Sequence, residues 1–278
     1  MRLRSLLFVP GDRPDRMEKA LASGADALIL DLEDSVTPER KGDARAAVAA
    51  FLAKQHSGPT LWVRINPLDS GMTPDDLAAA RGADGIVLPK SASGQDVAAL
   101  DAMLAGVAAR ILPIATETPA AIFGLGSYAG CSPRLAGITW GAEDLPAAIG
   151  AQSSREADGR YTPPYEMIRG LTLFGAHAAG VAPIETVYPD FRDLDGLAAY
   201  CARAMRDGFT GMMAIHPAQV PVINAAFTPS EAAIAHAQAV VAAFAANPGA
   251  GALQLDGKMI DAPHLKQARA LLARAGAA

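Results

Sequence analysis

Residues 111–118 read Ile-Leu-Pro-Ile-Ala-Thr-Glu-Thr, and residues 135–144 read Leu-Ala-Gly-Ile-Thr-Trp-Gly-Ala-Glu-Asp. Each run is a short apolar segment, typical of a buried strand, that ends in acidic side chains. In a barrel of parallel strands, the carboxyl ends of the strands form the face where chemistry takes place. Glu117 and Asp144 would converge there, and carboxylate oxygens are the ligands that Mg²⁺ prefers. The two runs therefore predict a magnesium-dependent enzyme.

The same strand-like pattern recurs along the chain and alternates with Ala-rich helical patterns. We expect strands over 3–9, 27–32, 60–65, 85–89, 111–115, 135–141, 181–188 and 211–216, and helices over 14–23, 40–54, 74–80, 94–106, 165–179 and 194–207. This alternation predicts a parallel sheet. Eight such units in 278 residues favour a (β/α)8 TIM barrel. A doubly wound open sheet is the alternative, but no G-x-G-x-x-G turn follows the first strand.

The pattern changes after the eighth predicted strand. A helix is expected near 229–246, and a turn-rich stretch at 247–251 separates it from the last segment of the chain. We therefore expect a TIM barrel over residues 1–222 and a C-terminal helical extension over residues 223–278. The extension would lie over an active-site mouth, its own or a neighbour's. The polar stretch 150–164 follows the sixth strand and predicts a long active-site loop.

Composition narrows the class of protein. Apolar residues make up 51% of the chain, enough for a sizeable core, and the net charge is −5. No basic field of the kind used to bind nucleic acid is present, and no apolar run is long enough to span a membrane. The basic and apolar N-terminal segment stops at Pro10, which favours a first strand over a signal peptide. We expect a cytoplasmic protein without nucleic-acid or membrane partners.

Further acidic residues follow the second predicted strand. Asp31 and Glu33 should share a face because side chains alternate along a strand, and Asp34 comes next. Several carboxylates in one mouth would repel each other, and a divalent cation would resolve that conflict. Ligation by oxygen alone favours Mg²⁺ over Zn²⁺. Asp31, Glu33 and Asp34 are therefore expected to hold metal-bound waters.

Basic residues stand at two places near the predicted mouth. Arg64, after the third strand, has a planar donor fork suited to a carboxylate or an enolate oxygen, and it could equally neutralise the carboxylates. Arg13, Arg16 and Lys19 cluster at the start of the first helix, where phosphates can bind. From the pattern alone, a solvated helix face is the favoured interpretation of this second group.

Seven motifs occur in order along the chain: Leu7-Phe8-Val9-Pro10-Gly11, Asp31-Leu32-Glu33-Asp34-Ser35-Val36, Val63-Arg64-Ile65-Asn66, Thr116-Glu117-Thr118, Gly141-Ala142-Glu143-Asp144-Leu145, Val187-Tyr188-Pro189-Asp190-Phe191 and Ile215-His216-Pro217-Ala218-Gln219-Val220. This ordered set resembles the citrate lyase β-subunit-like (HpcH/HpaI aldolase/citrate lyase) family, which contains citrate lyase β chains, malyl-CoA lyases and citramalyl-CoA lyases. The resemblance covers almost the whole chain. It implies a TIM barrel, Mg²⁺, and reversible carbon–carbon cleavage of a 3-hydroxyacyl thioester.

The resemblance also implies residue roles. Glu117 and Asp144 match the metal ligands of the family, and Arg64 matches its substrate-binding arginine. The basic residues of the first helix match its CoA-binding region, which favours Arg16 and Lys19 over a merely solvated face.

The C-terminal segment resembles the CoA-thioester lyases of that family. Residues 256–264, Asp-Gly-Lys-Met-Ile-Asp-Ala-Pro-His, are similar to a motif whose aspartate acts as catalytic acid/base and is supplied across a subunit interface. That aspartate corresponds to Asp261. The resemblance therefore implies a homotrimer or a hexamer, and it favours a stand-alone CoA lyase over a subunit that needs an acyl-carrier protein.

The combined expectation is a lyase that cleaves a short 3-hydroxyacyl-CoA, citramalyl-CoA or malyl-CoA, to acetyl-CoA and a 2-oxo acid. Arg64 would stabilise charge on the thioester oxygen, and Asp261 would protonate the enolate. The sequence leaves open whether the oxo acid is pyruvate or glyoxylate. Three alternatives stay open: a citrate lyase β subunit acting on a carrier-bound citryl thioester, an aldolase for free 2-oxo acids, and a non-catalytic CoA-binding protein.

Overall fold

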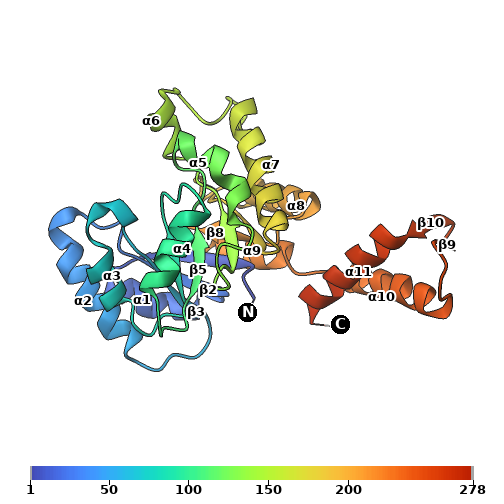
Figure 1. Ribbon diagram of the computed structural model, residues 1–278, viewed down its shortest axis with the longest axis horizontal. Helices are drawn as coiled ribbons and strands as arrows, with labels where there is room; N and C mark the ends of the chain where they lie inside the picture. The colour runs from blue at the N-terminus through green and yellow to red at the C-terminus, as the bar shows by residue number, and fades with distance from the viewer. Residues whose placement is uncertain (1, 277–278) are drawn as a thin grey trace. The chain divides into compact units, whose positions relative to one another are not determined.

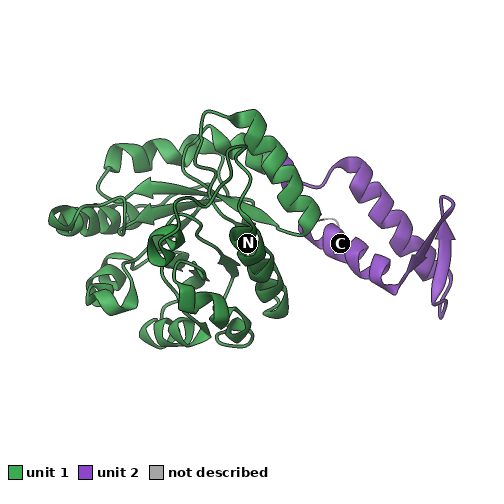
Figure 2. Ribbon diagram, turned by 90° about the horizontal axis from the view of Figure 1, so that it is seen from above, with its two compact units in different colours: residues 1–225 green, residues 226–278 purple. Residues whose placement is uncertain are grey.

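The computed structural model describes residues 2–276 (Figure 1). The chain divides into two compact units, residues 1–225 and residues 226–278 (Figure 2). Across the described residues, no helix combines the length and the apolar character needed to cross a membrane.

An eight-stranded parallel sheet forms the centre of the first unit. Its strands are β1 (Ser5–Pro10), β2 (Ala27–Asp31), β3 (Thr60–Arg64), β4 (Gly85–Leu88), β5 (Arg110–Pro113), β6 (Gly137–Thr139), β7 (Ala182–Glu185) and β8 (Gly211–Ala214). They follow the order β5-β4-β3-β2-β1-β8-β7-β6. Two isolated parallel bridges, Ile111 to Leu135 and Ile114 to Thr139, bring β5 against β6, so the sheet is a nearly closed barrel. The predicted TIM-barrel fold is confirmed.

Helices follow the strands in the alternation that the sequence predicted. They are α1 (Pro14–Ala20), α2 (Lys41–Leu52), α3 (Thr73–Ala79), α4 (Gly94–Met103), α5 (Pro119–Gly124), α6 (Leu145–Ile149), α7 (Pro163–Ala178), α8 (Leu194–Asp207) and α9 (Gln219–Ala226). Short 3-10 turns lie at Leu21–Ser23, Pro38–Arg40, Leu68–Ser70 and Leu125–Tyr128. Helices α5 and α9 were not among the predicted helices, because six or eight residues carry too little apolar periodicity to detect.

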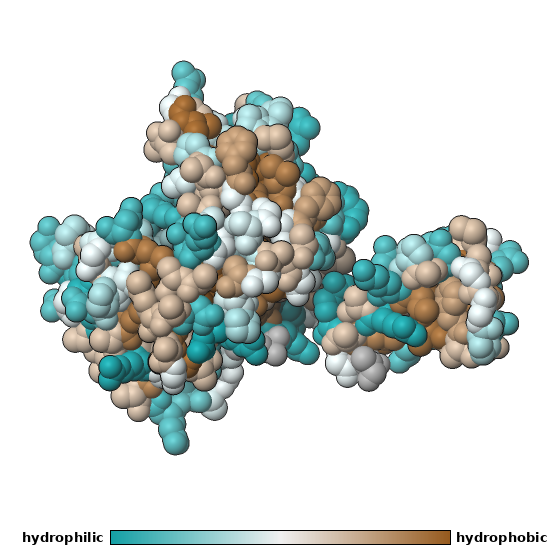
Figure 3. All heavy atoms as spheres, viewed as in Figure 1, coloured by the Kyte–Doolittle hydropathy of each residue, from teal (hydrophilic) through white to brown (hydrophobic). Residues whose placement is uncertain are grey.

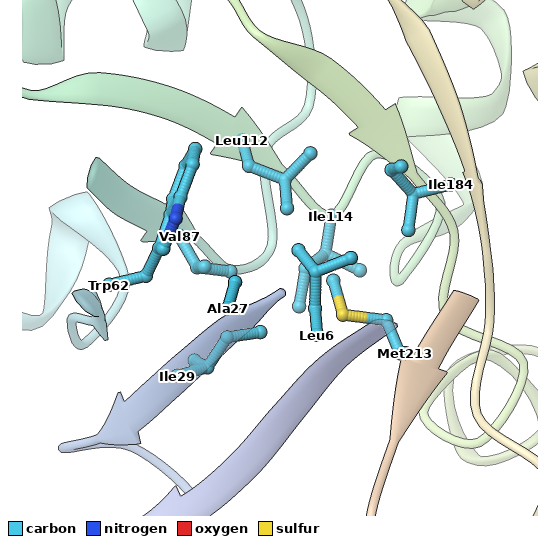
Figure 4. Close-up of a cluster of buried hydrophobic side chains, with 9 residues drawn as sticks. All are labelled: Leu6, Ala27, Ile29, Trp62, Val87, Leu112, Ile114, Ile184 and Met213. Carbon is cyan, nitrogen blue, oxygen red and sulfur yellow. The ribbon is translucent and has the colours of Figure 1, made fainter. Parts of the chain in front are cut away.

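Apolar side chains fill the inside of the barrel. Figure 4 shows one cluster made of Leu6, Ala27, Ile29, Trp62, Val87, Leu112, Ile114, Ile184 and Met213. The indole of Trp62 leaves no room on the neighbouring strand, since a Cβ atom on Gly85 would lie 2.2 Å from Trp62 Cε3. Gly85 is therefore the residue that lets β4 pack beside this ring.

Large apolar side chains are exposed on neighbouring helices of the first unit. Met167, Leu171 and Phe174 lie three or four residues apart on α7, so they share one face. Phe123 on α5 is 93% exposed, and Ile149 of α6 is also exposed. Figure 3 shows hydrophobic side chains gathered over α5, α6 and α7. An exposed apolar surface of this kind is typical of an interaction site.

The second unit contains α10 (Glu231–Ala246), the antiparallel hairpin β9 (Ala252–Leu255) and β10 (Lys258–Asp261), and α11 (Ala262–Ala275). Its own small core consists of Ala237, Val240, Ile260, Ala268 and Leu272. The helix predicted near 229–246 is present as α10, but the hairpin that follows it was missed. The sequence contains a signal for this hairpin, because Asp-Gly is a typical two-residue hairpin turn. In the structure, Asp256 and Gly257 both adopt the positive φ of such a turn.

We expect Gly85→Ala to destabilise the barrel by about 2 kcal/mol, because the added methyl group would overlap the fully buried indole of Trp62. Urea denaturation measures this change. Gly42→Ala is the matched control: no atom lies within 4 Å of the added Cβ, and alanine in helix α2 should be neutral or stabilising by about 0.5 kcal/mol. Equal effects of the two substitutions would contradict the packing argument.

Candidate active site

A pocket of about 440 Å³ opens at the carboxyl ends of the strands. Residues within or just after every strand except β4 line its wall. The lining residues are Phe8, Pro10, Arg16, Asp31, Asp34, Ser35, Arg64, Ile114, Glu117, Thr139, Trp140, Gly141, Ala142, Glu143, Asp144, Thr186, Val187, Met213 and Ile215. Most of the predicted site residues are among them, because the ends of parallel strands meet at one rim of a barrel.

Arg64 is held rigidly at this rim. Strands β2 and β3 pair Asp31 with Arg64, and the guanidinium binds that carboxylate through two hydrogen bonds of 2.7 Å. Its NH1 atom lies 2.8 Å from Glu33 Oε2, and the group stacks 4.8 Å from the centre of the Phe8 ring. Burial opposes the charge, but the hydrogen bonds and charges of the carboxylates raise the pKa of Arg64 above its ordinary value. A guanidinium has five N–H donors, so these contacts leave donors for a ligand.

Lys90, which follows β4, links two parts of the site. Its Nζ lies 2.5 Å from Glu33 Oε1, and its backbone N–H donates to Glu117 Oε2 at 2.5 Å. The backbone φ angle of Lys90 is 51°, a left-handed conformation that residues other than glycine rarely adopt. Sequence reasoning assigned no role to Lys90. The available signal was weak, since charged residues end most of the strands.

The acidic residues after β2 are compensated by these cations. Asp31 pairs with Arg64, Glu33 lies between Arg64 and Lys90, and Asp34 is 3.8 Å from Arg64 with its side chain 57% exposed. Arg64 and Lys90 therefore offset much of the repulsion among these three carboxylates. Their expected role of holding metal-bound waters stays a prediction.

Glu117 lies in a different environment. The residue is 4% exposed, and burial raises the pKa of its carboxyl to about 8, with Glu33 and Asp144 adding to the shift and the Lys90 N–H opposing it. A Cβ atom on Gly141 would lie 2.8 Å from Glu117 Cγ, so only glycine leaves space for this side chain. A bound cation would stabilise the ionised form of this carboxyl.

Asp144 stands at the N-cap position of α6 but makes no side-chain hydrogen bond that caps this helix. It lines the pocket together with Glu117. Over residues 2–276, the His, Cys, Asp and Glu side chains form no group of three or more arranged to hold a metal ion. Mg²⁺ is commonly held by one or two carboxylates, with waters and substrate completing its shell, whereas structural zinc needs four protein ligands. The pair therefore fits Mg²⁺.

The three predicted basic residues of α1 and its approach are not brought together. Arg16 lines the pocket. Arg13 is engaged by Asp15, with Nε 3.1 Å from Oδ1, and Lys19 is exposed on α1 outside the lining residues. Of the three, only Arg16 is therefore in contact with the pocket.

Comparison with known proteins identifies the family. Residues 4–217 match the HpcH/HpaI aldolase/citrate lyase family. The chain belongs to this family. It is 36% identical over 282 residues to a (3S)-malyl-CoA thioesterase from Cereibacter sphaeroides, covering 99% of this chain and 95% of the relative. It is 32% identical over 299 residues to an L-malyl-CoA/beta-methylmalyl-CoA lyase from the same species, covering 98% and 94%.

A solved structure of the family supports the fold. Protein CitE from Mycobacterium tuberculosis, in complex with magnesium, acetoacetate and coenzyme A, aligns with a TM-score of 0.81. The alignment covers 98% of each chain at 34% sequence identity. The HpcH/HpaI barrel and the C-terminal helices are therefore shared by both proteins.

Asp261 belongs to the second unit, at the end of β10 and the start of α11. Its Oδ1 lies 2.5 Å from His264 Nδ1, and this hydrogen bond holds the pKa of the Asp261 carboxyl below its ordinary value. Its expected action in the pocket of another copy of this family member stays a prediction.

The loop over residues 150–164 is anchored to the pocket wall. The Tyr161 ring lies 5.0 Å from the ring of Trp140, a lining residue. Trp140 in turn donates from Nε1 to Glu185 Oε1 at 2.5 Å, and Arg169 binds the other oxygen of that buried carboxylate. The loop that the sequence predicted at the active site therefore contacts the pocket through one aromatic side chain.

We expect Asp31→Asn to lower the free energy of unfolding by about 3 kcal/mol at neutral pH, because the buried Arg64 loses its charged partner. Burial raises the pKa of Asp31, but the contacts with Arg64 and with two N–H donors lower this pKa by a larger amount. The pKa of Asp31 is therefore below its ordinary value. The stabilisation is therefore present at neutral pH and is lost as the pH falls below about 4. Urea denaturation across pH measures both effects.

Asp34→Asn is the control for this experiment. Asp34 is 3.8 Å from the same guanidinium but largely exposed, so its loss should cost less than about 1 kcal/mol. If the two variants lose similar free energies of unfolding, or if the difference between them does not shrink in acid, the buried Asp31–Arg64 pair does not determine the stability of this rim.

Proposed function

We propose that this family member is a magnesium-dependent carbon–carbon lyase that cleaves a short 3-hydroxyacyl-CoA, citramalyl-CoA or malyl-CoA, to acetyl-CoA and a 2-oxo acid. One observation carries the proposal. The buried Glu117 carboxyl group lines the pocket together with Asp144 and with a charged Arg64 that is held by Asp31. Such a site suits a substrate with both an oxygen that a cation can bind and a second oxygen that gains negative charge.

Glu117 and Asp144 would hold the magnesium ion. When bound, Mg²⁺ supplies a Lewis acid for the oxygen of the oxo-acid half of the substrate. The protein prepares this position in advance, since Gly141 leaves space for the Glu117 side chain and the Lys90 N–H fixes one of its oxygens. The Glu117 side chain would therefore not need to move when the cation binds.

Arg64 would stabilise the negative charge that develops on the thioester oxygen during cleavage. Its guanidinium is fixed by Asp31 and Glu33, so its remaining donors need no rearrangement during the reaction. Arg16 would bind a phosphate of CoA, a role supported by its position in the pocket lining, and Lys19 and Arg13 would act only at longer range.

Asp261 would exchange the proton at the carbon of the acetyl-CoA enolate. Its contact with His264 keeps the carboxylate ionised at neutral pH, so it can accept a proton in the condensing direction. We propose that it acts in a neighbouring subunit of a homotrimer or hexamer. The exposed apolar surface over α5, α6 and α7 supports assembly of this kind.

Thioester hydrolysis is a second candidate, favoured by the relative that is a (3S)-malyl-CoA thioesterase. The two reactions have different products: hydrolysis of malyl-CoA gives malate and free CoA, whereas the lyase gives glyoxylate and acetyl-CoA. The carrier-dependent subunit and the free-acid aldolase are further alternatives, and both predict that the purified chain does not cleave CoA esters.

The first test is an assay of the purified chain with racemic citramalyl-CoA and malyl-CoA, with Mg²⁺ and with EDTA. We expect release of acetyl-CoA and of pyruvate or glyoxylate that depends on Mg²⁺. Free CoA appearing with malate or citramalate would assign the thioesterase instead. No cleavage of either thioester by folded protein would refute both candidates.

Two substitutions separate metal binding from proton transfer. Glu117→Gln should weaken Mg²⁺ binding by more than about tenfold, because even indirect partners of metal ligands contribute that much. Asp261→Asn should lower kcat by about 10² to 10⁴ and leave Mg²⁺ binding unchanged, because it removes only an acid/base group. Calorimetric Mg²⁺ titrations and the lyase assay measure the two properties. Near-normal kcat in Asp261→Asn would exclude the acid/base assignment.

A further inference from the structure

Thr139 is the last residue of β6, and its side-chain hydroxyl makes no hydrogen bond to the described residues that would stabilise the fold. The residue lines the pocket and is 1% exposed, and its Oγ1 atom has no hydrogen-bond partner among residues 2–276. By contrast, Thr116 at the same rim is satisfied, because its hydroxyl donates to the carbonyl of Gly141 and accepts from the Gly141 N–H.

Thr139 lies in an otherwise apolar layer of the barrel. It pairs with Ile184 of β7 and forms a bridge with Ile114 after β5. Residues paired in register on neighbouring strands share a face, so all three side chains point to the barrel interior. Figure 4 shows Ile114, Ile184 and Met213 gathered in that interior. Ile114 and Met213 also line the pocket, so this layer forms the pocket floor.

An unpaired hydroxyl in such a layer lowers stability, because it loses its hydrogen bonds to water and gains none. Valine has nearly the same shape and would fill the position without that loss. A threonine here is therefore a local conflict between sequence and fold, and such conflicts concentrate at functional sites. Rotation about the Cα–Cβ bond exchanges the staggered positions of the hydroxyl and the methyl group, so the hydroxyl can turn toward a bound molecule.

We propose that the Thr139 hydroxyl donates a hydrogen bond to a carboxylate oxygen of the 2-oxo acid that forms half of the substrate. This inference rests on the proposed lyase function and adds a binding residue to it. The position favours the small acid over the CoA portion, because the backbone carbonyl of Thr139 accepts from the N–H of Ala115, two residues before Glu117. Thr139 therefore lies beside the segment that leads to the proposed metal ligand Glu117, and both residues line the pocket.

The chemistry of the floor matches such an acid. A hydroxyl that donates to a charged oxygen makes a stronger hydrogen bond than one to a neutral oxygen. The side chains of Ile114 and Met213 beside it offer apolar contact for the rest of a small molecule. A short acid would match both features of the floor, with its anionic end at the Thr139 hydroxyl and its apolar or unsubstituted end against Ile114 and Met213.

The test uses isothermal titration calorimetry of the full-length protein with pyruvate and with glyoxylate, in the presence of Mg²⁺. We expect Thr139→Val to bind the preferred acid about tenfold more weakly than the wild type does, and Thr139→Ser to bind it within about threefold. Thr139→Val should also melt at a higher temperature than the wild type, because the unpaired hydroxyl is gone. Loss of affinity together with a gain in stability is an outcome that a merely structural threonine would not give.

Thr172→Val is the matched control. Thr172 is also fully buried, but on α7, and its hydroxyl donates to the Ile168 carbonyl at 3.0 Å. Its substitution should bring no gain in melting temperature and no change in affinity for either acid. If Thr139→Val does not fold, Thr139→Ala and Thr139→Ser provide the same comparison of affinities.

The inference is overturned if Thr139→Val binds both acids as tightly as the wild type does, or if the wild type binds neither. Its failure is distinguishable from failure of the proposed function. A wild type that binds the acid through Thr139 but cleaves no thioester would refute the lyase alone. Cleavage with unchanged KM and unchanged acid affinity in Thr139→Val would refute only the role of Thr139.

Discussion

The ion pair between Asp31 and Arg64 is the interaction on which the pocket depends. Strands β2 and β3 place the two residues opposite each other, and their side chains form two hydrogen bonds of 2.7 Å at a nearly buried position. Glu33 and Lys90 extend this pair into a network that reaches the Glu117 carboxyl group, which accepts from the Lys90 backbone N–H. Because each buried charge is balanced by a neighbour, the loss of one would leave others unpaired and displace the rim.

The network makes the two walls of the pocket electrostatically different. On one wall the carboxylates are matched by Arg64 and Lys90, and donors remain for an anionic ligand. Around Glu117 and Asp144, no cation within residues 2–276 forms a salt bridge with either carboxyl group, and burial disfavours the charge on Glu117 more than the nearby Lys90 favours it. A cation bound by Glu117 and Asp144 and an anionic oxygen near Arg64 would together neutralise the site, which is the arrangement that a metal-assisted cleavage of an oxygen-rich thioester requires.

Several features that cost stability lie at this one rim. Lys90 has a left-handed backbone, Glu117 is a buried carboxyl with a raised pKa, and Thr139 carries an unpaired hydroxyl. In a sequence that otherwise fits its fold, a residue that lowers stability indicates a position where binding or catalysis determines which amino acid is present. The interior layers below, made of aliphatic side chains and Trp62, show no such conflict and supply the stability.

The sequence by itself determined the barrel and the acidic and basic residues of its rim. Strand periodicity is a local property, and parallel strands that close into a barrel bring their carboxyl ends together, so Glu117, Asp144 and Arg64 could be placed without coordinates. Only the tertiary structure decided which charges are paired, that Lys90 connects Glu33 with Glu117, and that Arg16 lines the pocket whereas Arg13 and Lys19 do not. These facts depend on side-chain directions and on contacts between strands far apart in the chain, which no local pattern contains.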